Sequence, residues 1–282
     1  MAVTDVDFEL KIESGANLVD MEYGLETMTG FSGAIAITTD CILSNEVPSK
    51  MSYSDNVRAK LMGACIGSYK QDFKLVISDP VKSANLKRIG NSVLSELITY
   101  FICEAMYVEP PALTKKAEKV LSKMEKIESK VIDRISERVK DMHKISRSNK
   151  YPVVLKRKTK LRNFKLFEIN KNTASNLFNL TTDSNSIEID AIVTRFNSFT
   201  GNGRLLADGD SVTIPFSFSG PYSKVKASTK RLMPENLHDN NAVADELITR
   251  LKITANAKRN TSGDIVKYMI LGASKPLVSA CG

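Results

Sequence analysis

The segment GACIGSYK at residues 63–70 contains glycines, a serine and a lysine, which together could bind the phosphates of a nucleotide. The P-loop that does this has the pattern G-x-x-x-x-G-K-[ST], with the lysine directly after the second glycine. Here Gly63 and Gly67 lie one residue too close, and Ser68-Tyr69 stands in place of the lysine and the hydroxyl residue. We therefore predict a hairpin turn at Gly67-Ser68 instead of a phosphate site.

The segment IEIDAIV at residues 187–193 places Glu188 and Asp190 on one side of a predicted strand. In some metal-dependent nucleases an E-x-D strand is followed by a strand with E-x-K, so that carboxylates and a lysine converge on Mg²⁺. The next two predicted strands, GRLLA and VTIPFSF, contain no carboxylate and no lysine. We therefore expect Glu188 and Asp190 to be exposed positions of an ordinary strand.

Residues for other catalytic sites are scarce. The two histidines, His143 and His238, have no obvious nucleophile beside them, and the four cysteines lack metal-ligand spacing. We expect no catalytic residues, no metal site and no cofactor, and reduced thiols typical of a cytoplasmic protein. The chain has no apolar run long enough for a transmembrane helix, and its first residues do not resemble a signal peptide.

Positive charge is concentrated in the middle of the chain. Residues 115–165 contain 18 Lys and Arg against 6 Asp and Glu, whereas the rest of the chain has 22 basic and 26 acidic residues. Such asymmetry indicates a polyanionic partner, and nucleic acid is the first candidate. The densest part gives the candidate phosphate contacts Lys156, Arg157, Lys158, Lys160, Arg162 and Lys165.

The first 110 residues alternate between strand and helix patterns. Strands are predicted at 4–12, 57–66 and 69–77, and helices at 20–43 and 84–107. Pro110-Pro111 ends the second helix. The first helix contains Gly24, Gly30 and Gly33, whose small size would let another element pack closely. This order predicts a compact α+β domain.

Residues 112–146 have the pattern of one long helix with mixed charge. Its apolar positions alternate steps of four and three, as in a coiled coil, and the seam then shifts as in a stutter. Two interpretations stay open: pairing with a second copy or another protein, or a single helix that spans two domains. The residues assigned to oligomerisation are Leu113, Val120, Met124, Ile127, Val131, Ile135 and Met142.

The remainder of the chain is mostly β in pattern, without long helices. Strands are predicted at 187–196, 203–207, 212–218, 247–258 and 265–273. About five strands in this length are typical of a small barrel. The fold class is therefore α+β: an N-terminal α+β domain (1–110), a long basic helix and connector (111–163), and a small OB/SH3-like β-barrel (164–282).

The segment RFNSFTGNGRLLADGDSVTIPFSF, residues 195–218, resembles the first strands of cold-shock domains, which are OB-like barrels. It keeps Phe196, Asn197, Gly201, Gly203 and Phe216 of that pattern. Most positions that carry base-stacking aromatics in the family are not aromatic here, so the resemblance implies barrel geometry more than single-strand binding. Arg195 and Arg204 are kept as candidate phosphate contacts.

The layout as a whole resembles a group of uncharacterised bacterial two-domain proteins with an N-terminal α+β domain and a C-terminal barrel. The shared features are the glycine-containing helix, the G-x-x-x-G-S segment at 63–68, the charged connector and the F-N-x-x-x-G-x-G-R-L segment at 196–205. The resemblance implies an accessory role in a bacterial antiviral-defence or mobile-element system and supplies no catalytic residues.

Three functional hypotheses follow. The first is a non-catalytic subunit that binds nucleic acid or acts as an adaptor. The second is a structural or regulatory subunit that forms homo-oligomers or binds a protein through residues 112–146 without nucleic-acid contact. The third is an enzyme. Charge and a barrel of a kind often used for nucleic acid favour the first.

Overall fold

The computed structural model describes residues 4–48, 57–65 and 69–276. It divides into two compact units, Met1–Leu177 and Phe178–Gly282. The predicted boundary at 163/164 therefore differs from the observed one, because the segment after the basic run pairs with strands of the first unit. The predicted turn at Gly67-Ser68 and the cysteine at position 281 lie outside the described residues.

The first unit is built on an antiparallel sheet with the strand order β2-β3-β1-β4-β5. The predicted strands at 4–12, 57–66 and 69–77 are present, and the basic run supplies the remaining two. The strands are β1 (Thr4–Ile12), β2 (Val57–Cys65), β3 (Tyr69–Ile77), β4 (Val153–Lys158) and β5 (Asn163–Ile169).

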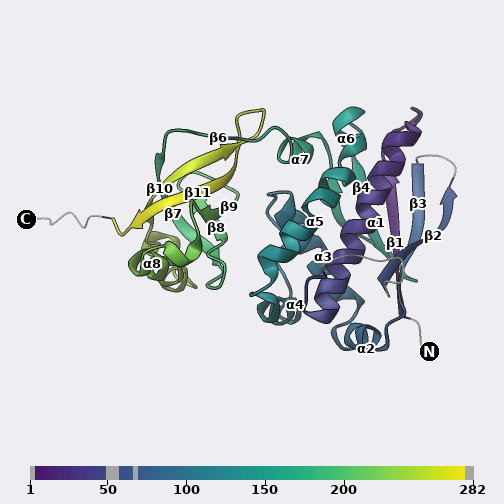
Figure 1. Cartoon of the computed structure of the whole chain (residues 1–282), viewed down its shortest axis with the longest axis horizontal. Coiled ribbons are helices and arrows are strands. Elements are labelled where there is room, and N and C mark those ends of the chain that lie inside the picture. Colours follow the sequence, from purple (N-terminus) through teal and green to yellow (C-terminus); the bar gives the residue numbers. More distant parts are fainter. Residues whose placement is uncertain (1–3, 49–56, 66–68, 277–282) are drawn as a thin grey trace, which may run out of the picture. The chain divides into compact units, whose positions relative to one another are not determined.

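Helices α1 (Met21–Ser44), α3 (Asn91–Ala105) and α5 (Glu128–Met142) gather on one side of this sheet (Figure 1). Phe31 of α1 stacks on Phe167 of β5, with ring centroids 6.1 Å apart. The predicted role of Gly30 is confirmed, since a Cβ there would lie 2.3 Å from the backbone nitrogen of Met142. The small residue lets the backbones of α1 and α5 approach each other.

The single helix predicted at 84–107 is wrong: two helices, α2 (Pro80–Ile89) and α3, replace it. Gly90, with φ +89°, ends α2 and precedes α3. Asp79 caps α2 by accepting a hydrogen bond from the Lys82 N–H, and Pro80 occupies the first turn, where its missing N–H costs nothing. The apolar residues keep helical spacing on both sides of Gly90, because both helices cover the same core.

The long helix predicted at 112–146 is also wrong. The segment forms α4 (Lys115–Leu121), the 3₁₀ turn η1 (Ser122–Met124), α5, and α6 (Lys144–Ser148). A chain that bends in this way can lie against its own domain, and α5 buries Val131, Ile135, Val139 and Met142. These residues therefore belong to the core of the first unit.

The assignment of the heptad positions to oligomerisation needs correction on the same ground. Met124, Val131, Ile135 and Met142 have almost no exposed surface, so they cannot contact a second chain while the unit is folded. Leu113, Val120 and Ile127 are half-buried. A seam of apolar residues shows that a helix face is covered, but its periodicity does not say by what.

The second unit is a closed, mixed five-stranded barrel. Its strands pair in the cyclic order β7-β8-β9-β11-β10, with β9 and β11 parallel and the other pairs antiparallel. The barrel encloses a core that includes Val193, Leu205, Phe216 and Ile253. The strands are β7 (Ile187–Phe196), β8 (Gly203–Ala207), β9 (Ile214–Phe218), β10 (Leu251–Arg259) and β11 (Ile265–Ser274), and the two-residue β6 (Thr181–Thr182) pairs with β10.

The expectation that this unit lacks long helices is wrong, because α8 (Ala227–Asp239) packs against β7. Pro234 lies inside this helix, and proline normally argues against a helix at that position in a sequence. Asn236 joins it to the barrel by accepting the Val193 N–H at 2.8 Å and donating to the Thr249 carbonyl at 2.7 Å. Shorter elements are α7 (Lys171–Ser175), η2 (Tyr222–Lys224) and η3 (Asp245–Leu247). Within the described ranges, no helix is long and apolar enough to cross a bilayer.

Candidate nucleic-acid interface

One face of the first unit's sheet carries charged side chains, and we call it the open face. On β1, buried Val6, Phe8, Leu10 and Ile12 alternate with outward positions, as expected for a strand covered on one side. The charged outward positions of the three central strands are Asp5, Asp7, Glu9 and Lys11 on β1, Lys70, Asp72 and Lys74 on β3, and Lys156 and Lys158 on β4.

The three central strands differ in charge. β1 contributes three carboxylates, whereas lysines predominate on its neighbours β3 and β4. The antiparallel register sets Glu9 opposite Lys156 and Asp7 opposite Lys74, and such cross-strand pairs of opposite charge are favourable. The same register sets Glu9 opposite Asp72, a like charge that is unfavourable there. Lys70 and Lys158 offset this repulsion, because they form ion pairs with Glu9 and Asp72.

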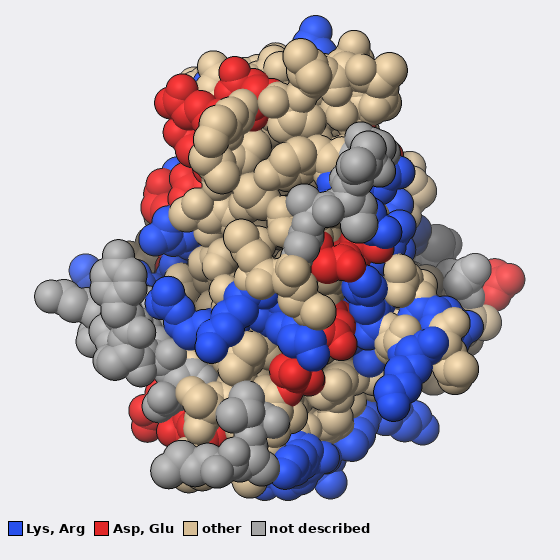
Figure 2. Space-filling view, turned by 90° about the vertical axis from the view of Figure 1, so that its right-hand side faces the viewer, with Lys and Arg blue, Asp and Glu red and all other residues tan. Residues whose placement is uncertain are grey.

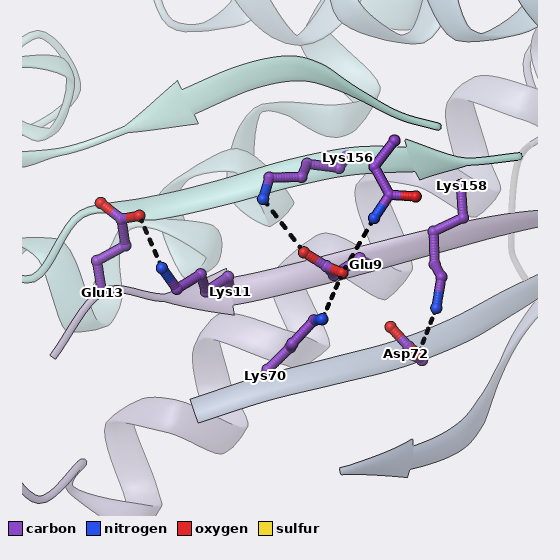
Figure 3. A network of polar contacts seen from close by, with 8 residues as sticks. Glu9, Lys11, Glu13, Lys70, Asp72, Lys156 and Lys158 are labelled. Atoms are coloured by element: carbon purple, nitrogen blue, oxygen red, sulfur yellow. Dashed lines mark hydrogen bonds and ion pairs between the residues drawn. The ribbon is translucent and has the colours of Figure 1, made fainter. Parts of the chain in front are cut away.

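Glu9 lies at the centre of the open face, and Figure 3 shows lysines reaching it from both neighbouring strands. Its side chain is only 3% exposed. The Lys70 ammonium lies 2.8 Å from one carboxylate oxygen, and the Lys156 ammonium lies 3.3 Å from the other. Asn163 donates a third, longer hydrogen bond at 3.4 Å. Burial alone would raise the pKa of Glu9, but the hydrogen bonds from Lys70 and Lys156 outweigh it and lower the pKa.

Further ion pairs extend from this centre. Lys158 pairs with Asp72, and Lys74 pairs with Asp5 at 3.1 Å and with Asp7 at 3.4 Å. At Glu9, by contrast, two lysines share one carboxylate. These ion pairs therefore link the three central strands of the open face.

Figure 2 looks at the side on which β2 and β3 lie in Figure 1. Lysine and arginine side chains spread over the middle and lower part of this view, with carboxylates between them. The charged side chains are therefore not confined to one ion pair.

The β4–β5 hairpin contains all six basic residues of the predicted run, but it does not present them in one direction. Lys156 and Lys158 lie on the open face, whereas Arg157 follows Leu155 on the side of the helices. Arg157 stacks on Phe164 at 4.9 Å from the ring centroid, and burial lowers its pKa. Lys165 pairs with Glu168 at 2.7 Å.

The turn of the hairpin presents two more predicted residues, Lys160 and Arg162, and both are exposed. The Arg162 guanidinium lies 4.3 Å from the centroid of the Phe164 ring, in cation–π contact. These two cations continue the basic character of β4 beyond the end of the strand.

The two barrel arginines were also candidates for phosphate contact. Arg204 is only 3% exposed and donates to the hydroxyl and to the carbonyl oxygen of Thr213, each at 2.7 Å. The prediction that Arg204 contacts phosphate is therefore corrected, because its guanidinium forms hydrogen bonds within the barrel unit. Arg195 lies opposite Arg204, and burial together with that neighbouring charge lowers its pKa to about 10.

Sequence reasoning missed the acidic half of the open face and the lysines of β3. Their signal was present, since Asp5, Asp7 and Glu9 occupy the alternate positions of a predicted strand, as do Lys70 and Lys74. The sequence did not show that β4 lies next to β1 in the sheet. β4 adds to β1 from 147 residues away in the chain, measured from Glu9 to Lys156.

The other chemical candidates lie elsewhere in the molecule. Glu188 and Asp190 are exposed on β7, as predicted, and their cross-strand neighbours are Thr254 and Lys252. The part of the chain that the structure describes contains no group of three His, Cys, Asp or Glu side chains that could hold a metal ion. Cys41 is a free, buried thiol, and burial raises its pKa to about 12.

The chain was compared with models of protein families, with curated proteins and with solved structures, and none of them matches it.

Proposed function

We propose that this protein is a non-catalytic nucleic-acid-binding or adaptor subunit whose open face and β4–β5 turn contact backbone phosphates. The observation that carries the proposal is the placement of Lys156 and Lys158 on the open face, where their side chains are 30% and 33% exposed. Lys160 and Arg162 extend that charge along the same hairpin.

The side chains of the open face favour contact with phosphates over contact with bases. Its described positions on β1, β3 and β4 carry no aromatic side chain on which a base could stack. Lysine is a compact, flexible charge that suits phosphate oxygens without fixing a direction. We therefore propose binding that depends on the backbone and discriminates little between sequences.

We further propose that the barrel is of the OB type, which often binds oligonucleotides through its second and third strands. Its strand order, its parallel β9–β11 pair and the helix between β9 and β10 support this. The corresponding strands here are β8 and β9, where Arg204 is bonded to Thr213 and Phe216 is 1% exposed. We therefore assign the main polyanion contact to the sheet of the first unit.

The proposal is tested by fluorescence anisotropy with duplex and single-stranded oligonucleotides at two salt concentrations. A complex with about four phosphate contacts should weaken about a hundredfold between 50 and 200 mM salt, because each contact contributes a slope of about −0.9. Undetectable binding at low salt, or binding that salt does not weaken, contradicts the proposal.

A neutralised variant locates the site, and a matched variant controls for net charge. The test variant replaces four basic residues of the hairpin by glutamine: Lys156, Lys158, Lys160 and Arg162. The control replaces four exposed lysines of the segment from α4 to α5: Lys116, Lys119, Lys123 and Lys130. We expect the first variant to lose most of its affinity and the second to keep it. Equal losses would show that only the net charge of the protein matters.

Self-association is a second candidate function, favoured by a different observation. An apolar cavity of about 320 Å³ lies between α1 and the strands β2 and β3, and Phe31 and Phe73 line it. Leu25 and Leu61 also line it and remain largely exposed. Light scattering on the 31.1 kDa chain distinguishes this function, since a monomer at high concentration excludes it.

A further inference from the structure

The turn between β4 and β5 holds an apolar side chain in solvent. Leu161 is 96% exposed, more than any other large hydrophobic residue in the described ranges. The Thr159 N–H donates to the Arg162 carbonyl at 3.1 Å, and the Arg162 N–H donates to the Thr159 hydroxyl at 3.1 Å. The Thr159 hydroxyl also donates to the Arg162 carbonyl at 2.6 Å. The turn is therefore ordered, and its geometry directs Leu161 outward.

A single exposed leucine is common on protein surfaces and by itself indicates nothing. Here the residues on either side of Leu161 are the exposed cations Lys160 and Arg162. Arg162 is oriented by its stacking on Phe164, 4.3 Å from the ring centroid. The tip thus combines one apolar side chain with a cation on each side, on a two-stranded hairpin.

Proteins that kink duplex DNA often use this combination. An apolar side chain enters between two base pairs and partly unstacks them, while cations next to it hold the phosphates. Unstacking costs free energy at each step, which additional contacts with the bent duplex offset. Such additional contacts are available here, because Lys156 and Lys158 lie on the strand that leads into the turn.

Resting on the proposed function, we propose that Leu161 is a wedge that inserts between base pairs of duplex DNA from the minor groove. Lys160 and Arg162 then contact the phosphates on either side of the inserted leucine. The required partner is a duplex, because a wedge needs stacked base pairs to part and two backbones beside them.

An anionic lipid surface is the rival partner for an apolar side chain between two cations. Burial of one leucine alone contributes less than millimolar binding requires. The attraction of a single lysine or arginine to an anionic surface adds only a small further contribution. Two cations and one leucine would therefore hold a membrane weakly, whereas a duplex also engages the lysines of β4.

The test uses the full chain and short DNA duplexes that contain the fluorescent base 2-aminopurine at a TA step. Unstacking of this base increases its fluorescence. We expect wild-type protein to increase the fluorescence and Leu161→Ala to abolish most of the increase, while duplex affinity changes by less than about threefold, or about 0.7 kcal/mol. The control Leu18→Ala removes another side chain that is 93% exposed, and it should behave as wild type.

Three outcomes overturn the wedge, and they separate it from the proposed function. Salt-dependent duplex binding without a fluorescence increase, or with an equal increase in Leu161→Ala, refutes the wedge and leaves the proposed function standing. Absence of duplex binding refutes the wedge, and absence of binding to single-stranded oligonucleotides as well refutes both. Binding to vesicles of anionic phospholipid that requires Leu161, without binding to either kind of oligonucleotide, assigns the tip to a membrane and refutes both as well. Leu161→Ala should fold normally, since substitutions at exposed positions change stability little.

Discussion

Lys156 lies directly opposite Glu9 on the neighbouring strand, and its ammonium is 3.3 Å from the carboxylate. The pair is asymmetric, because the Glu9 side chain is 3% exposed and that of Lys156 is 30% exposed. Lys70 approaches the same carboxylate from the other side. The lysine stems thus cover the carboxylate, while their charged ends remain in reach of solvent. Glu9 therefore both stabilises the sheet and reduces the charge that a polyanion would meet.

The substitution Glu9→Gln should have opposite effects on stability and on nucleic-acid binding. It leaves two lysines close together without their counter-charge, so the free energy of unfolding should fall by about 1–2 kcal/mol. That is less than the 3–5 kcal/mol of a fully buried pair, because both lysines are partly solvated. Affinity for DNA should rise, and the salt slope should grow by about one contact. Urea unfolding and anisotropy measure the two quantities.

Glu13→Gln is the matched control for this substitution. Glu13 is exposed, and it pairs with Lys11 at 3.2 Å on the same unit. Its removal should change stability by no more than about 0.5 kcal/mol. If Glu9→Gln is folded and binds DNA less tightly than wild type, Lys70 and Lys156 do not contact phosphate.

The apolar seam of α5 is expected to contribute to folding and not to self-association. Ile135 has no exposed surface, so Ile135→Ala should lower the free energy of unfolding by about 2–5 kcal/mol. The mass measured by light scattering should be the same as that of wild type. Glu137→Ala, an exposed change on the same helix, should leave both properties nearly unaltered. A loss of oligomer specific to Ile135→Ala would restore the coiled-coil interpretation.

Much of the fold could be predicted from the sequence, because strand periodicity is a local property. The strand at 187–196 was placed residue for residue, and the helix at 20–43 to within one residue at each end. The heptad pattern of 112–146 failed for a physical reason. Its apolar side chains needed a covering surface, and α1 supplied it once the chain bent after Met124. Periodicity cannot distinguish that surface from a second copy.

The candidate interface was predicted only in part, because the sequence shows which residues are charged but not in which direction their side chains point. The density of lysine and arginine residues was enough to locate the β4–β5 hairpin. Arg157 and Lys158 are neighbours in sequence, yet strand alternation sends them to opposite sides of the sheet. Arg204 was expected to be an exposed cation, but its side chain is buried and donates hydrogen bonds to Thr213. Its partners could be known only once β8 and β9 were paired.

His143 provides a prediction that does not depend on any partner. It is fully buried after α5, where its Nδ1 lies 2.6 Å from the Val139 carbonyl and its Nε2 lies 3.1 Å from the Thr173 hydroxyl. Nδ1 donates to the carbonyl, which leaves Nε2 of the neutral ring without a proton. The Thr173 hydroxyl beside it also lies within donating distance of the Asn170 carbonyl, at 3.0 Å. Burial lowers the pKa of His143 from 6.5 to about 4, although the bond to Val139 opposes the shift. The neutral ring is therefore the form that the folded protein accommodates.

The stability of the protein should accordingly decrease as the pH falls below 6.5. The folded pKa lies below that of the unfolded chain, so the unfolded state binds the proton first and gains free energy from it. Between pH 7 and pH 5 the loss should be about 2 kcal/mol, at about 1.4 kcal/mol for each pH unit below 6.5. Glu9 does not contribute in this range, because its lowered pKa confines its effect to pH values below about 4.5. Urea unfolding at pH 7, 6 and 5 measures the slope.

His143→Gln should be less stable at pH 7, and its free energy of unfolding should change little with pH. His238→Gln, at an exposed position, should keep the wild-type slope. A slope that persists in His143→Gln would mean that another group takes up the proton.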